Sequence, residues 1–303
     1  MTEIIDVLLN NILPIFLVAG IGFALRRAAV VDVRTVARVT FYGLSPCLVF
    51  YSLVTAQLQS SELLLLGGYS FINILLMGGV GWVVGWLLRL AHLDTVALIL
   101  ALMFVNSGNY GLTLLELRYG ETGVARGIAY FIVSTILAYS LGVLVASSGK
   151  SSPQQALRQL LRVPAVYAVI LAILVYALDI HLPTPILSGL EIAAQGAIPV
   201  MLLVLGMQLA DLRVMEGIGI ATVAVFLRLG VAPLLALWLA DRMDLEGISR
   251  AAMLLEASMP TAVLVIVLAT EFDVRPRLIT TIVVLSTLLS PLTLAILISW
   301  AGL

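Results

Sequence analysis

Residues 103–111 read MFVNSGNYG, and they interrupt an apolar stretch that runs from about residue 95 to residue 115. The asparagines, serine and glycines in this stretch are poor helix formers, and each polar side chain costs free energy when it is buried in hydrocarbon. If the chain spans a membrane, the stretch predicts a break in a spanning helix. The rest of the sequence decides whether it does.

The composition is that of a membrane protein. Of the 303 residues, 62% are hydrophobic and 11% are charged, and the mean hydropathy is +1.15, whereas about a quarter of a soluble domain is charged. We therefore expect an all-α polytopic membrane protein in the lipid bilayer. The net charge of −1 argues against a nucleic-acid partner, and a single cysteine, Cys47, excludes an internal disulfide.

A helix that crosses the bilayer needs roughly 20 apolar residues. This length predicts ten spans, at residues 4–25, 35–56, 62–88, 95–116, 122–146, 163–180, 186–210, 215–240, 248–270 and 278–301. The polar segment 147–162 separates five spans on each side. We therefore divide the chain into residues 1–146, the linker 147–162 and residues 163–303.

The basic residues of alternate loops predict the orientation, because Lys and Arg accumulate on the cytoplasmic side. One side holds Arg26, Arg27, Arg34, Arg38, Arg89, Lys150, Arg158, Arg162, Arg213, Arg275 and Arg277. The other side holds Arg118, Arg126, Arg242 and Arg250. This bias predicts a cytoplasmic linker, two external termini and a location in the cell membrane.

Three landmarks of the first half recur about 150 residues later: Pro14 pairs with Pro164, Pro46 with Pro199, and Ser107 with Pro260. Five spans are an odd number, so the second half must enter the membrane from the opposite side. The sequence therefore predicts a 5+5 inverted repeat, an arrangement characteristic of secondary transporters.

In this repeat, MFVNSGNYG corresponds to EASMPTAV at residues 256–263, in the ninth span. Non-helical backbone is tolerated at membrane depth only where protein buries it or where it lines a cavity. Breaks in spans four and nine therefore indicate a substrate site. We expect substrate to bind Asn106, Ser107, Asn109, Tyr110, Gly111, Arg228, Ser258, Pro260 and Thr261. Residues expected at helix breaks or lining the site are Ser45, Pro46, Gly108, Gln195 and Pro199.

Arg228 lies near the middle of the eighth span, where a charged residue is a candidate functional residue. Its guanidinium can hold a substrate carboxylate with two parallel hydrogen bonds. Alternatively, it forms an ion pair with Glu256, about one turn before Pro260, or extends toward an interface. Glu256 itself is either a structural partner or a proton carrier.

Four stretches resemble the auxin efflux carrier family: LSPCLVFYSL from residue 44, NSGNYGLTLLELRYG from 106, GAIPVMLLVLGMQLAD from 196 and ASMPTAVLVIVLATEF from 257. The resemblance implies ten helices in a 5+5 inverted repeat, with helices 4 and 9 broken and crossing. It also implies an elevator-type movement and an organic anion as substrate. The short linker differs from the long loop of plant members, so we expect a bacterial type of carrier.

We therefore expect a secondary transporter that moves a small organic anion such as a carboxylate, bound where helices 4 and 9 cross. The alternative is a membrane sensor or receptor that uses a transporter fold only to bind ligand. No catalytic motif is present, so we do not expect an enzyme. We expect no cofactor and no metal site other than sodium near the crossover, with Na⁺ and H⁺ both open as coupling ions. We also expect a homodimer.

Overall fold

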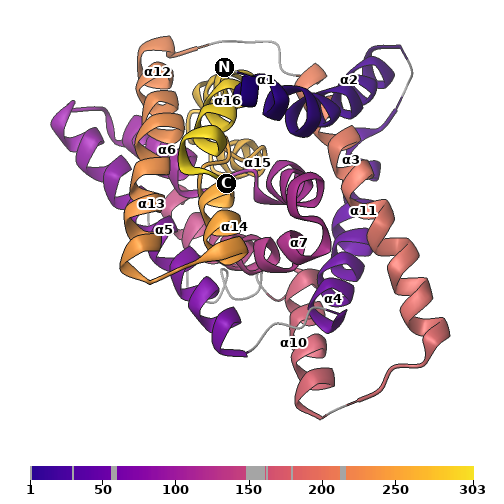
Figure 1. Cartoon of the computed structure of the whole chain (residues 1–303). Helices are drawn as coiled ribbons and strands as arrows, with labels where there is room; N and C mark the ends of the chain where they lie inside the picture. Colours follow the sequence, from indigo (N-terminus) through magenta and orange to yellow (C-terminus); the bar gives the residue numbers. More distant parts are fainter. Residues whose placement is uncertain are drawn as a thin grey trace.

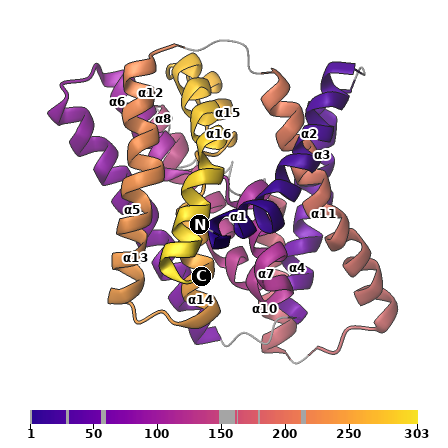
Figure 2. The same ribbon diagram turned by 45° about the horizontal axis from the view of Figure 1, so that its top comes forward.

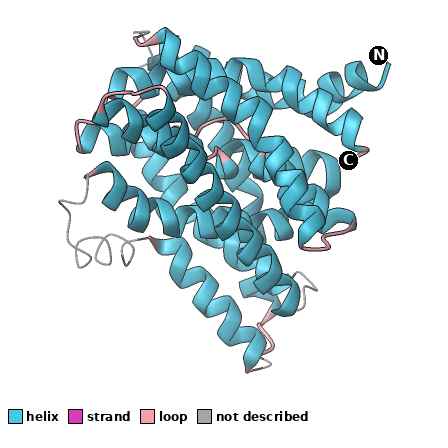
Figure 3. Ribbon diagram, turned by 90° about the vertical axis from the view of Figure 1, so that its left-hand side faces the viewer, coloured by secondary structure: helices cyan, strands magenta, loops and turns pink. Residues whose placement is uncertain are grey.

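The described chain is almost entirely helical, as the composition predicts (Figure 3). The computed structural model describes residues 2–28, 31–55, 60–147, 161, 163–178, 180–211 and 216–303, so most of the predicted linker lies outside the described residues. The α-helices are α1 (Thr2–Val7), α2 (Leu13–Ala28), α3 (Val33–Val39), α4 (Ser45–Thr55), α5 (Ser60–Leu87), α6 (His92–Met103), α7 (Leu112–Leu137), α8 (Val143–Ala146), α10 (Pro164–Ala177), α11 (Thr184–Asp211), α12 (Ile218–Phe226), α13 (Ala232–Arg242), α14 (Gly247–Ala257), α15 (Leu264–Glu271) and α16 (Pro276–Ala301).

Wider π-helical turns join several of these helices: η1 (Leu8–Ile12), η2 (Thr40–Leu44), η3 (Ser107–Gly111), η4 (Ala138–Gly142) and η5 (Leu227–Val231). Turns η1, η2 and η5 each end two residues before a proline, namely Pro14, Pro46 and Pro233. A proline ring crowds the carbonyl four residues earlier and donates no hydrogen bond. In all three cases that carbonyl lies in the π turn, which accounts for the local widening.

Seven helical stretches of the described chain are long and apolar enough to cross a membrane: Ile5–Ala28, Val33–Thr55, Ser61–Leu87, Ser107–Ala146, Thr184–Ala210, Ile218–Arg242 and Pro276–Ala301. Two shorter apolar helices are His92–Met103 and Pro164–Val175. Seven is fewer than the ten predicted because the predicted spans four and nine are broken into short helices, and the apolar helix of the predicted span six, Pro164–Val175, is short. The stretch Ser107–Ala146 continues through Gly120, whose φ of 60° is a conformation that glycine adopts readily.

The helices pack as two groups (Figures 1 and 2). The small group consists of α2, α3, α4, α10 and α11, with α11 packed on α2 and α4, and α10 packed on α4. The large group consists of α5 to α8 and α12 to α16, where α5 packs on α6 and α7, and α14 packs on α7. In Figure 1, α11 and α4 lie at the right and α5 and α13 at the left, with α7, α14 and α16 between them.

Glycines allow α2 and α11 of the small group to touch through their backbones. A Cβ atom at Gly206 of α11 would collide with the carbonyl oxygen of Ala19, and one at Gly22 of α2 would collide with the backbone of Leu203. Close backbone contact through small residues is a general way for helices to associate in lipid. The lipid tails are as apolar as the side chains, so burying an apolar side chain between helices gives little hydrophobic stabilisation.

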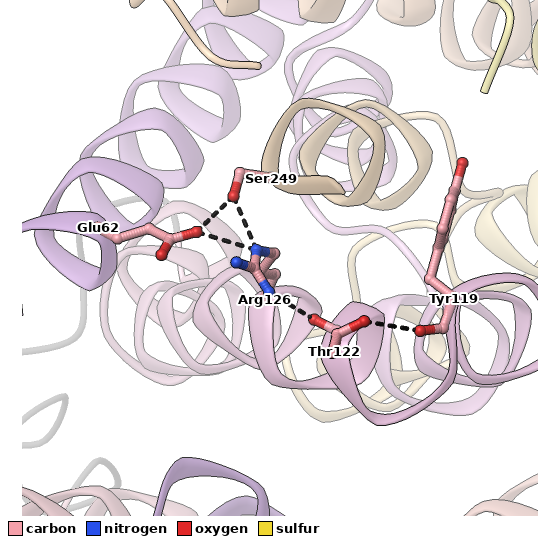
Figure 4. Close-up of polar contacts among 5 residues, drawn as sticks. All are labelled: Glu62, Tyr119, Thr122, Arg126 and Ser249. Atoms are coloured by element: carbon pink, nitrogen blue, oxygen red, sulfur yellow. Dashed lines mark hydrogen bonds and ion pairs between the residues drawn. The ribbon is translucent and has the colours of Figure 1, made fainter. Parts of the chain in front are cut away.

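A polar network ties three helices of the large group together (Figure 4). The Arg126 guanidinium of α7 donates from Nε to Glu62 Oε1 of α5 at 2.9 Å and to Ser249 Oγ of α14 at 2.8 Å. Ser249 in turn donates to the same Glu62 oxygen. Because three helices share one charged network, they are held in a common register.

Candidate functional site

The first helix break lies between α6 and η3. Phe104 is extended, with φ −110° and ψ 117°, and Asn106 has the non-helical angles φ −77° and ψ 59°. Regular helix resumes only after the π turn η3, which begins at Ser107. The predicted break at MFVNSGNYG is therefore present, and it leaves backbone groups on both sides without helical partners.

The second break separates α14 from α15. Ser258 leaves helical geometry with φ −97° and ψ 0°, and α15 begins only at Leu264. Pro260, between them, has no N–H to donate and restricts the residue before it. The break predicted around Pro260 is therefore also present.

The two breaks pair with each other. Val105 and Thr261 form an antiparallel bridge, in which the Asn106 N–H donates to the Pro260 oxygen at 2.8 Å and the Ala262 N–H donates to the Phe104 oxygen at 2.9 Å. The Thr261 hydroxyl adds a bond to the Ala101 oxygen at 2.9 Å. Segments far apart in sequence thus satisfy each other's backbone groups, as buried non-helical backbone requires.

Arg228 lies in η5 and is completely buried. Its Nη1 donates to the carbonyl oxygen of Leu102 at 2.7 Å, and its Nη2 donates to the carbonyl oxygen of Ala257. Both carbonyls belong to the last turns of helices that lead into the breaks. Among the described residues, Arg228 and Glu256 form no ion pair, which was one of the alternatives that the sequence left open. The guanidinium instead binds helix ends, whose carbonyls lack helical partners.

Glu256, near the end of α14, is also completely buried. A Cβ atom at Gly111 would collide with its carboxyl group, and one at Gly127 would lie 3.0 Å from Oε1, so two glycines of neighbouring segments make room for it. The carboxyl group lies close to the Ser107 side chain. Within the described chain, neither carboxyl oxygen has a well-formed hydrogen bond, and neither does the Ser107 hydroxyl.

A cavity of about 870 Å³ lies between the two helix groups, in the size range of small-molecule sites. Its wall at the first break is Asn106, Ser107, Gly108 and Asn109. The Asn106 side-chain nitrogen lacks a hydrogen-bond partner among the described residues. The second break contributes its apolar residues Ala262 and Val263 to the wall. The rest comes from α3, η2, α4, α7, η4, α11 and α15, and the aromatic side chains in the lining are Phe41, Tyr42, Phe104, Phe131 and Tyr139.

The cavity brings together only part of the predicted site. Ser45 and the residues of the first break from Asn106 to Asn109 line it, whereas Tyr110, Gly111, Arg228, Glu256, Ser258, Pro260, Thr261, Pro46, Gln195 and Pro199 do not. Tyr110 is buried behind the break and packs edge-on against Phe16, with ring centroids 5.9 Å apart. Gln195 is exposed, and its amide nitrogen lies 3.4 Å from Glu191 Oε1 in the same helix.

Several lining residues were not predicted. Ser134 and Thr135 of α7 and Gln208 of α11 contribute polar groups to the wall, and the Gln208 side-chain oxygen is buried without a partner in the described chain. Gln208 is a polar residue in an apolar span, but it lies within the continuous helix α11, so the argument from a helix break that identified Asn106 does not reach it. Arg34 and Arg38 also line the cavity, although the sequence identified them only as topology markers.

Comparisons with known proteins give the family of the chain. The family model described as "Membrane transport protein" matches residues 7–156 and 150–298. A transporter of Methanothermobacter thermautotrophicus is 28% identical over 293 residues, which cover 94% of this chain and 95% of the relative. A transporter of Methanocaldococcus jannaschii is 25% identical over 266 residues, which cover 85% of this chain and 86% of the relative. The chain therefore belongs to the membrane transport protein family, which confirms the family resemblance predicted from its sequence.

Proposed function

We propose that the protein is a secondary carrier that moves a small organic anion, such as a carboxylate, across the membrane. The observation that carries the proposal is the pairing of two broken helices beside a cavity of about 870 Å³. Asn106, Ser107 and Asn109 present amide and hydroxyl groups on the cavity wall. Broken helices that meet beside a cavity are the usual substrate-binding arrangement of secondary transporters.

The charges around the cavity favour an anionic substrate. Arg34 and Arg38 of α3 line it one helical turn apart, and Glu271 is the acidic residue in its lining. The Asp32 side chain accepts a hydrogen bond from the Arg34 N–H at 3.2 Å and caps α3. The Thr35 hydroxyl, which donates to Asp32 Oδ2, lowers the pKa of the Asp32 carboxyl. A cavity with excess positive charge raises the local concentration of anions.

The movement that we propose is of the elevator type, in a 5+5 inverted repeat of ten spans. In this arrangement the helix breaks lie in spans four and nine, the small group is the stationary part, and the large group carries the site. Ion pairs support the assumed span boundaries. Arg275 with Asp94 and Arg126 with Glu62 each join residues that the boundaries place on one membrane face. The bias of basic residues puts Arg34 and Arg38 on the cytoplasmic side, so in this proposal the cavity opens toward the cytoplasm. Both termini are then external.

Coupling to Na⁺ or H⁺ remains part of the proposal, with Glu256 as the candidate proton carrier. Ser107 lies between this carboxyl group and the cavity, since its side chain is close to Glu256 and it also lines the cavity wall. A homodimer in the cell membrane completes the proposed assembly.

Counterflow in proteoliposomes tests the proposal. Proteoliposomes that contain the purified protein are loaded with an unlabelled mono- or dicarboxylic acid, and uptake of the labelled form of the same acid is followed. The corresponding primary amide is the uncharged control. We expect counterflow of at least one carboxylate and none of its amide. A carboxylate that stabilises the protein against heat without ever exchanging would instead indicate a sensor. Exchange of the amide as fast as the acid would contradict anion selectivity.

A further inference from the structure

Two helix ends converge on one buried side chain. Helix α6 ends at Met103 and helix α14 ends at Ala257, and a break follows the last turn of each helix. The Arg228 guanidinium reaches both, through the oxygens of Leu102 and Ala257. No atom of Arg228 is accessible to solvent, and the residue is not part of the cavity wall.

Electrostatics explains why a cation belongs at this point. The last carbonyls of a helix lack partners within the helix and together carry about half a negative charge. Two such ends that meet in a site without water therefore present about one negative charge. Such ends of broken helices are places where transporters can coordinate cations. The planar guanidinium supplies one positive charge with donors in fixed directions, so it can bind both ends together.

We propose that Arg228 is a built-in cation that occupies the junction of the two helix ends and holds the two breaks in register. Arg228 is thus a positioning residue, acting through the backbone of both breaks rather than on the substrate. The position of Arg228 supports this role. It lies in the π turn η5, which belongs to the large group together with α6 and α14, so the guanidinium and both helix ends are part of the same group.

Among the described residues, the other polar side chains near Arg228 do not serve as acceptors for its guanidinium. The Tyr69 hydroxyl donates to the Ala236 oxygen at 2.9 Å, and the Tyr130 hydroxyl donates to Asn73 Oδ1 at 3.0 Å. Glu256, the buried acid closest in sequence to the second break, forms no ion pair with the guanidinium within the described chain. The two helix ends are therefore the acceptors that hold the charge.

Hydrogen exchange and chemical rescue test the proposal without any knowledge of the substrate. Backbone amide exchange is measured by mass spectrometry in the full-length wild type, Arg228→Lys and Arg228→Ala. The matched control is Arg242→Ala, which removes an exposed arginine at the end of α13. Because an ammonium is a single compact group, Arg228→Lys should leave one helix end without its donor. In Arg228→Ala, which lacks both donors, we expect exchange to rise by about tenfold or more in both breaks, around Asn106 and Ala262, as for loss of a hydrogen bond to a charged group. In Arg228→Lys we expect a rise of this size in one break.

Rescue then separates a specific cation site from a general loss of packing. Millimolar methylguanidinium should restore protection of both breaks in Arg228→Ala, whereas tetramethylammonium should not, because it cannot donate hydrogen bonds. If Arg228→Ala folds in neither solution, the lysine variant decides. Unchanged exchange at both breaks in Arg228→Lys, or a rise at only one break in Arg228→Ala that methylguanidinium leaves untouched, would overturn the proposal.

Discussion

Each of the two breaks is a non-helical segment between two helices, but their polar side chains have different hydrogen-bond partners. In the second break, the Ser258 hydroxyl donates to the Leu254 oxygen at 2.6 Å, and the Thr261 hydroxyl donates to the Ala101 oxygen at 2.9 Å. In the first break, the Asn106 side-chain nitrogen and the Ser107 hydroxyl have no well-formed partner in the described chain, and both residues line the cavity. The second break uses its hydroxyls to satisfy backbone carbonyls. We propose that the buried, unpaired groups of the first break are the ones that meet a ligand.

This difference teaches that a polar residue in a membrane helix is not by itself a binding residue. What matters is whether the surrounding protein already satisfies its hydrogen bonds. Ser258 and Thr261 were predicted as substrate ligands on the same grounds as Asn106, yet their hydroxyls are occupied by carbonyls and neither lies on the cavity wall.

The largest expected effect comes from the side chain that joins the breaks. Arg228→Met should destabilise the protein by about 3–5 kcal/mol, because two charge-assisted hydrogen bonds are lost and two buried carbonyls remain unpaired. Adding Glu256→Gln should not restore stability, since the structure shows no ion pair between Arg228 and Glu256. Thermal unfolding in detergent measures both variants. Recovery of wild-type stability in the double variant would mean that the charge pair is the main interaction of Arg228.

A second prediction concerns the contact between the first break and Glu256. A Cβ atom at Gly111 would collide with the Glu256 carboxyl group, so Gly111→Ala should cost about 1–3 kcal/mol by overpacking. Combining it with Glu256→Asp should recover part of this loss because the shorter side chain withdraws, whereas Glu256→Gln should recover none. Gly20→Ala is the control, since no atom lies within 4 Å of a Cβ there. Equal melting temperatures for Gly111→Ala and Gly20→Ala would refute the contact.

A third prediction removes one bond of the second break while keeping the shape of the side chain. Thr261→Val leaves the Ala101 oxygen without its hydroxyl donor and should cost about 1–3 kcal/mol of stability. Because Thr261 does not line the cavity, the affinity of the folded protein for a carboxylate should stay near the wild-type value. Thermal unfolding and isothermal titration measure the two quantities separately, and a loss of affinity without a loss of stability would reverse the assigned roles.

The smallest expected effect concerns the arginines of the cavity wall. In a Cys47→Ser background, Asn109→Cys is labelled with anionic ethylsulfonate and cationic ethyltrimethylammonium methanethiosulfonates. Replacing Arg34 and Arg38 by Gln should lower the ratio of anionic to cationic labelling rates by roughly 3- to 10-fold at low salt, and less at high salt. Arg277→Gln is the control, because this exposed arginine does not line the cavity. A ratio that responds equally to both changes would remove the electrostatic argument for an anion.

The positions of the breaks could be predicted from sequence because their causes are local. Glycines, asparagines and Pro260 weaken a helix wherever they stand, so MFVNSGNYG and EASMPTAV identified both places. The bridge between Val105 and Thr261 brings these two predicted places together.

The partners of the polar residues could not be predicted in the same way. Arg228 binds the carbonyls of Leu102 and Ala257, and backbone carbonyls are present at every residue, so they give no sequence signal. Gln195 was expected near the site because it lies beside Pro199, but it faces outward. Gln208 and the wall of α7 depend on how the two helix groups approach each other, which no local pattern encodes.

The central claim is that the first break binds the substrate and the second does not. The most direct test is the affinity for the carboxylate selected by counterflow, measured by isothermal titration in Asn106→Ala, Asn109→Ala and Thr261→Val, together with their melting temperatures. We predict that the asparagine variants lose about 10- to 150-fold in affinity, as for a hydrogen bond to a charged group, and keep near-wild-type melting temperatures. Thr261→Val should show the opposite pattern. Wild-type affinity in both asparagine variants, or parallel losses of affinity and stability in all three, would contradict the claim.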